Sequence, residues 1–597
     1  MIFPTLPVRP RTAQTIDVFG GYNHNIRINE NEFYDMMNLT SDQAPVLCPR
    51  KARGLYAGDV NVQGMIAKDS LCYVDGSAFV INEYRVDMGL STDPELCPKQ
   101  LISMGAYVII MPDKKYFNTA DFTDYGAIEA EVTTAAPVSF YPCKMDGTEY
   151  TADYIQPEEP DAPANMALWI DTSTEPHSLK QYSASMNVWA GIETTYVKIF
   201  SSGIGAPFAQ YDGIRITGLK DQILDTGVAR SVKSDTGQLE ALDGAAIVYA
   251  RGEDFLVVAG ILDASVTISN AITVNRKMPA MDFVVENENR LWGCRYGLNN
   301  DGEVVNELYA CKLGDFRNWN CFMGISTDSY AVSLGSDGQF TGAIAHGGYP
   351  LFFKENWLHK VYGQIPANFS VQTTACRGVQ KGCDRSLAIV NEILYYKARH
   401  AVCAYDGSLP VEVSAVFGEE RYSNAVGAAH GNKYYISMEK ADGTDHVLMV
   451  MDTAKGMWHK EDDLAAYLLC ACRDELYCAT GDGKIITMLG SGDAWEEKVE
   501  WMAQTGIIGA SLPESKYLAK LNIRMVLEFG STATILAQYD SVGSWENLGT
   551  LTGTDLRSFT IPVRPRRCDH LRLRIEAKGK GMIFSITKTF AHGSDVS

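Results

Sequence analysis

The chain has 597 residues, of which 46% are hydrophobic and 21% are charged, and its formal net charge is −21. This length provides for several domains, and the composition is that of a globular protein. The negative charge argues against a protein that wraps nucleic acid, because duplex binding requires a basic surface. The sequence contains no run of about 20 apolar residues, so it predicts no membrane span. Its first residues contain prolines and no long apolar stretch, which does not fit a secretory signal. The sequence therefore predicts a chain that is made in a cytoplasm and does not insert into membranes.

The chain begins with a segment, residues 1–53, that is polar, punctuated by prolines and short of apolar periodicity. Such a segment predicts an extended arm, which lies across another part of the chain or across a neighbouring subunit. Residues 54–136 then contain two alternating apolar runs, near Leu71 and Tyr107, each broken by a polar turn. This pattern predicts two β-hairpins.

A long segment, residues 137–279, separates these hairpins from similar ones further along. It opens on the run YIQPEEPDAPAN and continues in short strand-like runs, among them ALWIDTS, TYVKIF and DFLVVAGIL. A structureless loop of this length is improbable in a compact domain, so we expect an inserted β domain. Its acidic cluster, Glu158, Glu159 and Asp161, lies in the proline-rich connection, where side chains are poorly positioned for catalysis.

Hairpins recur over residues 280–490. One is the stretch GGYPLFFKENWLHKVYG, in which an apolar run ends at a polar turn and alternation resumes at Trp357. First strands begin near Leu351, Leu394, Tyr434 and Leu476, roughly 40–60 residues apart, which is the length of one four-stranded propeller blade. We therefore expect residues 54–136 and 280–490 to form one β-propeller, with Trp357 mostly buried and facing a neighbouring blade.

The last segment, residues 491–597, reads as alternating strands separated by glycine-rich turns, which predicts a small antiparallel β-sandwich. It is locally basic, with arginines at positions 564, 566, 567, 572 and 574. These side chains either pair with acids on their own strands or dock a neighbouring acidic chain. The fold class predicted for the whole chain is all-β: a β-propeller with an inserted β domain and a C-terminal β-sandwich.

The fourteen cysteines and ten histidines suggest no metal or cofactor site. Cys470, Cys472 and Cys478 lack the paired C-x2-C spacing of zinc ligands, and a disulfide between Cys376 and Cys383 is not expected in a reducing cytoplasm. Most cysteines lie in apolar runs and are expected to be reduced packing residues. Six histidines fall about once per blade near strand ends, either as ligands around the propeller centre or, the interpretation we favour, as ordinary turn and interface residues: His346, His359, His400, His430, His446 and His459.

Several runs together resemble the β-propeller tail proteins of tailed double-stranded DNA bacteriophages, including nozzle and hub proteins. These runs are NENEFYDMMNLTSDQAPVLCPRKARG near the start, LWIDTSTEPHSLKQYSASMNVWAGIETTYVKI in the insert, ENRLWGCRYG followed by GDFRNWN, then FFKENWLHKVYG, AYDGSLPVEVS, WMAQTGIIGASLPESKYLAKLNI and RRCDHLRLRIEAKGKGMIFSITKTF. The resemblance covers most of the chain, and the insert differs in size from that of the short-tailed examples, which leaves the position in the tail open.

The resemblance implies a structural virion protein, without enzymatic activity, that assembles in the host cytoplasm. It implies a ring, often of six copies, around the channel through which DNA leaves the capsid, with other tail, adaptor or fibre proteins docked on it. DNA would pass without specific binding, so we expect a net negative channel wall. The arginines between 564 and 574 would then face a protein neighbour.

The alternative is a carbohydrate-binding or glycan-hydrolysing propeller that acts in host receptor recognition. A glycosidase needs two carboxylates held about 5–10 Å apart, and no motif in the sequence presents such a pair. The run SLGSDGQF, residues 333–340, is the stretch most similar to a sialidase turn motif, but it occurs only once. Phosphate-loop, H-E-x-x-H and G-x-S-x-G motifs are absent from the sequence. No catalytic, cofactor-binding or metal-binding residue is therefore predicted.

Overall fold

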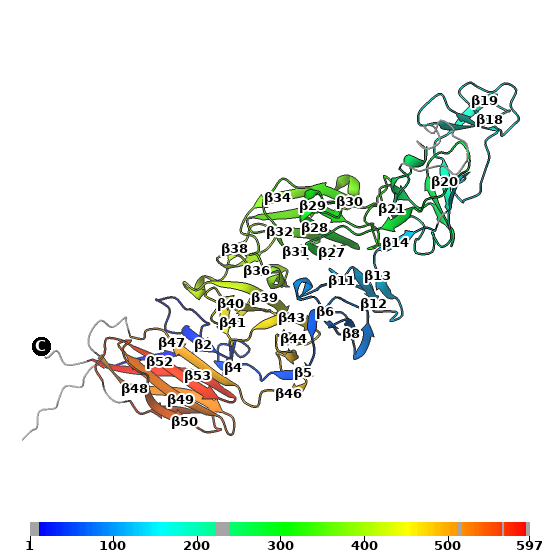
Figure 1. The fold of residues 1–597 in the computed structure, drawn as a ribbon. Coiled ribbons are helices and arrows are strands. Elements are labelled where there is room, and N and C mark those ends of the chain that lie inside the picture. Colours follow the sequence, from blue (N-terminus) through cyan, green and yellow to red (C-terminus); the bar gives the residue numbers. More distant parts are fainter. Residues whose placement is uncertain (1–10, 136, 221–237, 510–515, 564–565, 593–597) are drawn as a thin grey trace, which may run out of the picture. The chain divides into compact units, whose positions relative to one another are not determined.

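The computed structural model describes residues 11–135, 137–220, 238–509, 516–563 and 566–592. They form an all-β fold: a β-propeller with an inserted β domain and a C-terminal β-sandwich (Figure 1). The fold class predicted from the sequence is thus confirmed. Helical structure includes the one-turn 3₁₀ helices η1 (Pro94–Leu96), η2 (Pro366–Asn368), η3 (Asp384–Ser386) and η4 (Ala415–Phe417). In the described part of the chain, no helix is long and apolar enough to cross a membrane.

The chain divides into two compact units. The first comprises residues 1–101, 338–360 and 373–597, and the second comprises residues 102–337 and 361–372.

The first unit contains most or all of five propeller blades. Their strands, in sheet order, are β6 (Val62–Ala67), β7 (Leu71–Asp75), β8 (Ala78–Ile81) and β9 (Tyr84–Asp87); β31 (Phe340–His346), β32 (Tyr349–Lys354), β33 (Trp357–Tyr362) and β34 (Ser370–Ala375); β35 (Ala388–Val390), β36 (Ile393–Lys397), β37 (Val402–Tyr405) and β38 (Val411–Glu412); β39 (Tyr422–His430), β40 (Lys433–Lys440), β41 (His446–Asp452) and β42 (Met457–Lys460); β43 (Ala466–Cys472), β44 (Glu475–Thr480), β45 (Lys484–Thr487), β5 (Gly54–Gly58) and β46 (Asp493–Ala494).

Neighbouring blades of this unit contact one another through their first strands. β35 contacts β39, β39 contacts β43, and β43 contacts β6, so these first strands lie nearest the propeller centre. The blade of β43–β45 is completed by β5, a strand from the other end of the propeller sequence, with Lys484 paired to Gly58 and Thr487 to Gly54. The pairing of distant segments in one blade joins the beginning of the propeller to its end.

The hairpin at residues 347–363 has the predicted form. β32 and β33 pair antiparallel around Glu355 and Asn356, with Lys354 opposite Trp357. Leu358, His359 and Val361 are buried, and Trp357, which lies beside the turn at the start of β33, is mostly but not completely buried. This agrees with the expectation of a mostly buried Trp357, while contact of its indole with a neighbouring blade stays a prediction.

The C-terminal sandwich, also in the first unit, consists of two sheets. One contains β1 (Arg11–Ile16), β53 (Gly581–His592), β48 (Lys516–Leu527) and β51 (Arg557–Ile561); the other contains β2 (Phe33–Met37), β47 (Glu500–Thr505), β52 (Leu571–Lys578), β49 (Thr532–Tyr539) and β50 (Glu546–Leu551). Both sheets thus incorporate a strand from the first 53 residues. The short strands β3 (Leu39–Thr40) and β4 (Cys48–Pro49) pair with each other nearby.

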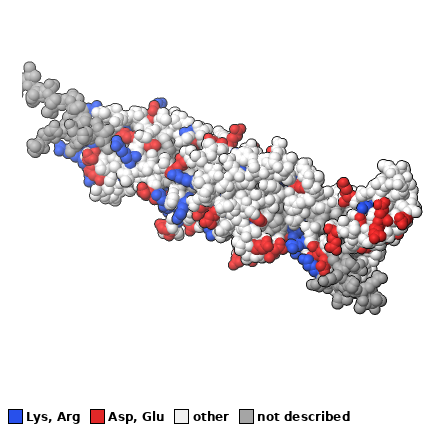
Figure 2. Space-filling view, turned by 90° about the horizontal axis from the view of Figure 1, so that it is seen from above, with Lys and Arg blue, Asp and Glu red and all other residues white. Residues whose placement is uncertain are grey.

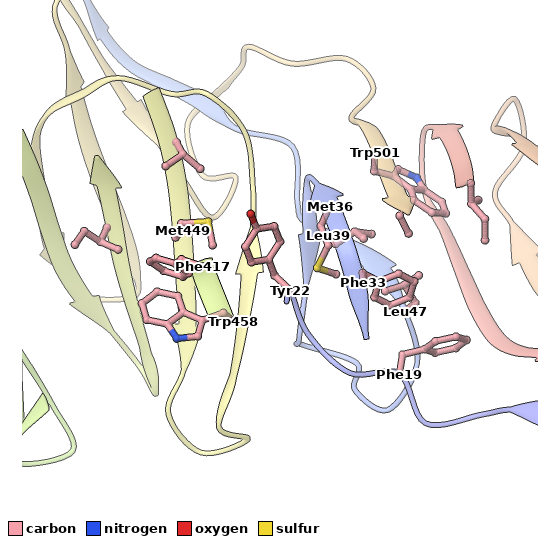
Figure 3. Packing of buried hydrophobic residues seen from close by; sticks show 14 of the residues in the cluster. Phe19, Tyr22, Phe33, Met36, Leu39, Leu47, Phe417, Met449, Trp458 and Trp501 are labelled. Atoms are coloured by element: carbon pink, nitrogen blue, oxygen red, sulfur yellow. The ribbon is translucent and has the colours of Figure 1, made fainter. Parts of the chain in front are cut away.

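The N-terminal segment packs between the sandwich and the blade of β39–β42 (Figure 3). On one side, Phe33 and Met36 pack in a buried cluster that includes Trp501 of the sandwich. On the other, the backbone N–H of Tyr22 donates to the carbonyl of Trp458 at 2.6 Å. The segment is therefore an integral part of the core of this unit.

The second unit contains two further blades and the inserted domain. The blades consist of β10 (Gln100–Met104), β11 (Tyr107–Met111), β12 (Lys115–Asn118) and β13 (Tyr125–Ala127), and of β27 (Phe283–Asn287), β28 (Arg290–Leu298), β29 (Val304–Ala310) and β30 (Tyr330–Ser333). The three insert sheets contain β14 (Ala130–Thr133), β26 (Thr273–Arg276), β21 (Gly213–Thr217) and β22 (Gly244–Ile247); β23 (Ala250–Arg251), β24 (Phe255–Ala259), β20 (Tyr196–Phe200), β15 (Val138–Cys143) and β25 (Val266–Ile268); β16 (Tyr154–Gln156), β17 (Leu168–Asp171), β18 (Ser178–Ser183) and β19 (Val188–Ile192).

The insert begins and ends on paired strands. β14, which follows the blade of β10–β13, lies antiparallel to β26, which precedes the blade of β27–β30. The chain therefore leaves and returns at one place. A core of aliphatic residues from the first two insert sheets supports this domain.

Candidate functional site

A polar cleft in the second unit is the strongest candidate for a binding site. Its volume is about 840 Å³, which falls in the range of small-molecule sites. Strands of the insert line one side, and the blade of β27–β30 with Lys114 of the blade of β10–β13 lines the other. The lining residues are Lys114, Glu129, Glu131, Arg215, Thr217, Thr273, Asn275, Lys277, Pro279, Ala280, Asn299, Asn300, Asp301, Glu307, Tyr309 and Asn320.

The insert wall is one face of the sheet β14-β26-β21, because side chains alternate between the two faces of a strand. Val132 and Val274 on the other face belong to the aliphatic core. On the cleft face, Asn275 of the central strand lies opposite Glu131 of β14 and Arg215 of β21. A second polar row consists of Thr133, Thr273 and Thr217. The pleat therefore separates an apolar face in the core from a polar face on the cleft.

The blade wall presents Glu307 and Tyr309 from β29. The Tyr309 hydroxyl donates to Glu307 Oε2 at 2.6 Å, and the Ser333 hydroxyl donates to Glu307 Oε1 at 3.1 Å. Burial and this bond to Glu307 raise the pKa of Tyr309, so the phenol remains a hydrogen-bond donor. Glu307 thus accepts two hydroxyl bonds from its own blade.

Three ion pairs lie along the cleft. Lys114 Nζ lies 2.7 Å from Glu129, Lys277 Nζ lies 2.9 Å from Glu131, and Arg215 Nη1 lies 3.2 Å from Asp301. Partly exposed pairs of this kind contribute little to stability, and the side chains of the last two pairs are about half exposed. Their polar atoms are therefore accessible to a ligand.

Buried hydrogen bonds hold the two walls together. Asp212, at the start of β21, forms a buried ion pair with Arg276 and accepts a 2.9 Å bond from Asn318 Nδ2. The Asn318 Oδ1 in turn accepts from the backbone N–H of Gly213 at 2.9 Å, where a Cβ would lie 2.4 Å from the Asn320 carbonyl oxygen. Asn318 belongs to the run GDFRNWN, so this run fixes the loop after β29 against the insert.

The cleft gathers four carboxylates, Glu129, Glu131, Asp301 and Glu307, that the sequence analysis did not single out. They come from three separate segments, and each looks like an ordinary strand or turn residue. No group of three or more histidine, cysteine or acidic side chains arranged to hold a metal ion is found among the residues that the structure describes. The carboxylates, amides and hydroxyls that line the cleft can form hydrogen bonds to a polar ligand.

The propeller centre of the first unit offers no carboxylate pair on its inner strands. β6, β31, β35, β39 and β43 contain neither aspartate nor glutamate. Their residues are mostly small or apolar. A pair of catalytic carboxylates in this unit would have to come from loops.

The acidic cluster of the insert is exposed, and three of the C-terminal arginines contact aromatic side chains of their own chain. Glu158, Glu159 and Asp161 are exposed in the connection after β16. Arg572 stacks on Tyr34 at 5.2 Å and Arg574 on Trp545 at 4.4 Å. Arg566 stacks on Tyr539, while Arg564 lies outside the described residues. These contacts within the chain are of the kind expected for strand arginines, and docking of a neighbour remains a prediction.

Most of the cysteines are buried packing residues, and of the six histidines named above His346, His359 and His459 are buried whereas His400 is exposed. His359 and His459 are buried, and burial lowers their pKa values to about 4 and about 3. They are therefore neutral at pH 7. Eleven of the fourteen cysteines are buried, and Cys376 and Cys383 are both free thiols. Burial raises the pKa of Cys478 to about 12, as expected for an inert thiol.

No protein-family model and no curated protein matches the chain. Among solved structures, an exo-β-1,3-galactanase from Phanerochaete chrysosporium is similar with 6% identity and a TM-score of 0.19, over 51% of this chain and 94% of that one. A GH43 glycoside hydrolase with xylanase and arabinofuranosidase activities has 8% identity and a TM-score of 0.18, over 53% and 99%. The extracellular domain of a putative hybrid two-component system from B. thetaiotaomicron has 8% identity and a TM-score of 0.16, over 92% and 99%.

These matches include no phage tail protein, and several are glycoside hydrolases. The prediction that the chain is not an enzyme is contradicted by them and is not retained. TM-scores this low carry no argument about substrate or catalytic residues. The tail-protein resemblance remains a prediction.

Proposed function

We propose that the chain is a structural protein of the tail of a tailed double-stranded DNA bacteriophage, which forms a ring and docks other tail proteins. The proposal is supported by the positions, in the fold, of the sequence runs that resemble tail proteins. The first of them supplies β2, which pairs with β47 of the sandwich, and the last supplies β52 and β53. GDFRNWN fixes the insert to its blade. The resemblance therefore falls on residues that join the parts of the fold.

The charge is compatible with this proposal. Acidic side chains are prominent on the face drawn in Figure 2, in keeping with a net charge of −21. In a ring this excess is multiplied by the copy number, and like charge along a channel keeps DNA from binding to its wall. We propose a net negative channel wall for the same reason.

Mass measurement and electron microscopy of the purified chain test the proposal. We expect rings, and for six copies a mass about six times the 65.6 kDa of one chain. A chain that stays monomeric at all concentrations, alone and with phage tail extracts, contradicts the ring. A channel lined with arginine clusters would instead indicate a protein that grips DNA.

A second candidate function is carbohydrate recognition or hydrolysis, and the polar cleft of the second unit favours it. Four carboxylates and several amides and hydroxyls line a cavity large enough for a few sugar units. Binding to a glycan array, with release of reducing sugar as the assay for hydrolysis, tests this function. If neither binding nor release is detected, the second candidate is refuted, whereas the ring proposal is unaffected.

A further inference from the structure

The polar rows of the insert wall have a regular spacing. Glu131, Asn275 and Arg215 lie side by side on three adjacent strands, and adjacent strands are about 4.8 Å apart. The threonine row, Thr133, Thr273 and Thr217, runs parallel to the first row two residues along each strand. A strand separation is close to the length of one pyranose unit, so an extended oligosaccharide crossing the strands would meet one polar side chain from each row per sugar.

The charges of the cleft disfavour an anionic ligand. Each of the three cations among the described lining residues already has a carboxylate partner: Lys114 with Glu129, Lys277 with Glu131, and Arg215 with Asp301. The remaining carboxylate, Glu307, accepts bonds from hydroxyl groups. A phosphate or uronate would therefore have to displace an acid from its cation, whereas neutral hydroxyl groups can add bonds to the pairs as they stand.

The lining chemistry matches neutral hydroxyl groups. Threonine hydroxyls and asparagine amides both donate and accept, as vicinal sugar hydroxyls require. The carboxylates accept, and Arg215 donates from a half-exposed guanidinium. We infer that the cleft binds a neutral oligosaccharide that crosses β14, β26 and β21, with Glu307 and Tyr309 on the opposite wall. This inference rests on the second candidate function.

The test compares neutral and acidic sugars on the full-length chain. Titration calorimetry uses cello-, xylo-, malto-, galacto- and chitohexaose as neutral probes and hexagalacturonate as the acidic probe. The cleft variant is the double substitution Glu131→Ala, Arg215→Ala. Both side chains are about half exposed, so the fold should be retained. The matched control is Glu500→Ala, Lys578→Ala, an exposed pair on the sandwich with a 2.7 Å contact.

We expect at least one neutral hexasaccharide to bind and its Kd to rise at least tenfold in the cleft variant, since bonds to charged groups are lost. The control should bind as the unmodified chain does. Thr217→Val, which removes one hydroxyl at nearly constant shape, should weaken binding by a few-fold.

The outcomes separate the inference from the function on which it rests. Preferential binding of hexagalacturonate, lost in the cleft variant, would keep carbohydrate recognition and overturn the neutral ligand. Equal weakening in the control and in the cleft variant would overturn the site. Binding of none of the six probes would overturn the inference, and a negative glycan array as well would refute the second function.

Discussion

Substitution of Arg53 by methionine should destabilise the first unit strongly. Arg53 has 2% of its side chain exposed and contacts Asp462 at 2.6 Å and Glu461 at 2.9 Å. Burial alone would lower the pKa of Arg53, but these carboxylates raise it above its usual value. Arg50 pairs with Glu496 in the same cluster at 2.7 Å. Two buried cations thus face three carboxylates, and loss of one cation leaves two uncompensated negative charges.

The expected cost is about 3–5 kcal/mol, the range for breaking a buried ion pair by removing one partner. Because the chain has several domains, a single unfolding free energy is not defined, so the assay is the midpoint of the thermal transition reported by tryptophan fluorescence. At about 2–4 °C per kcal/mol, the shift should be roughly 10 °C. The control is Arg85→Met, which removes a half-exposed partner of Asp75 and should shift the midpoint by about 2–4 °C at most. Equal shifts in the two variants would refute the argument.

Three further predictions concern the first unit. Glu30→Ala should cost several kcal/mol, on the order of 3–5, because it leaves the fully buried Lys588 without its 2.6 Å carboxylate partner; a shift no larger than that of an exposed substitution would contradict this. Trp357→Ala should shift the thermal midpoint less than Trp501→Ala, since Trp357 is not completely buried and Trp501 is 1% exposed. Burial lowers the pKa of His459 to about 3, so this ring stays neutral in the folded chain but is protonated in the unfolded chain below about pH 6.5. Stability should therefore be complete above about pH 6.5 and fall by about 1.4 kcal/mol per pH unit toward pH 3, and His459→Gln should flatten the measured midpoint between pH 7 and pH 5.

The propeller was predictable because its signal is local and repeated. Each blade contains hairpins whose strands are separated by a few residues, as at Glu355 and Asn356, so the apolar alternation and the turn appear in one window of sequence. The repeat then indicates the architecture. The burial of single side chains was less predictable, since Trp357 lies on the same face of β33 as the buried His359 and Val361 but is less completely buried at the end of the strand beside the turn.

The cleft could not have been read from the sequence in the same way. Its lining residues extend from Lys114 to Asn320 and come from several strands and turns. In isolation, Thr273 or Asn275 is an ordinary polar position on a half-buried strand. Only the pairing of β14, β26 and β21 brings them into rows, and that pairing joins residues far apart in the chain, such as Glu131 and Asn275, which are 144 positions apart.

The N-terminal segment shows why long-range strand pairing cannot be predicted from the periodicity of the sequence. Met36 pairs with Ala503, and Arg11 pairs with Ala591. These strands have five and six residues, too few to establish a period, and their partners lie more than 450 residues away. The segment nevertheless supplies Phe33 to the buried core and Glu30 to Lys588. The polar composition and the prolines correctly indicate that this segment forms no core of its own. Some of its side chains are nevertheless buried, because they complete the core of the sandwich and the neighbouring blade.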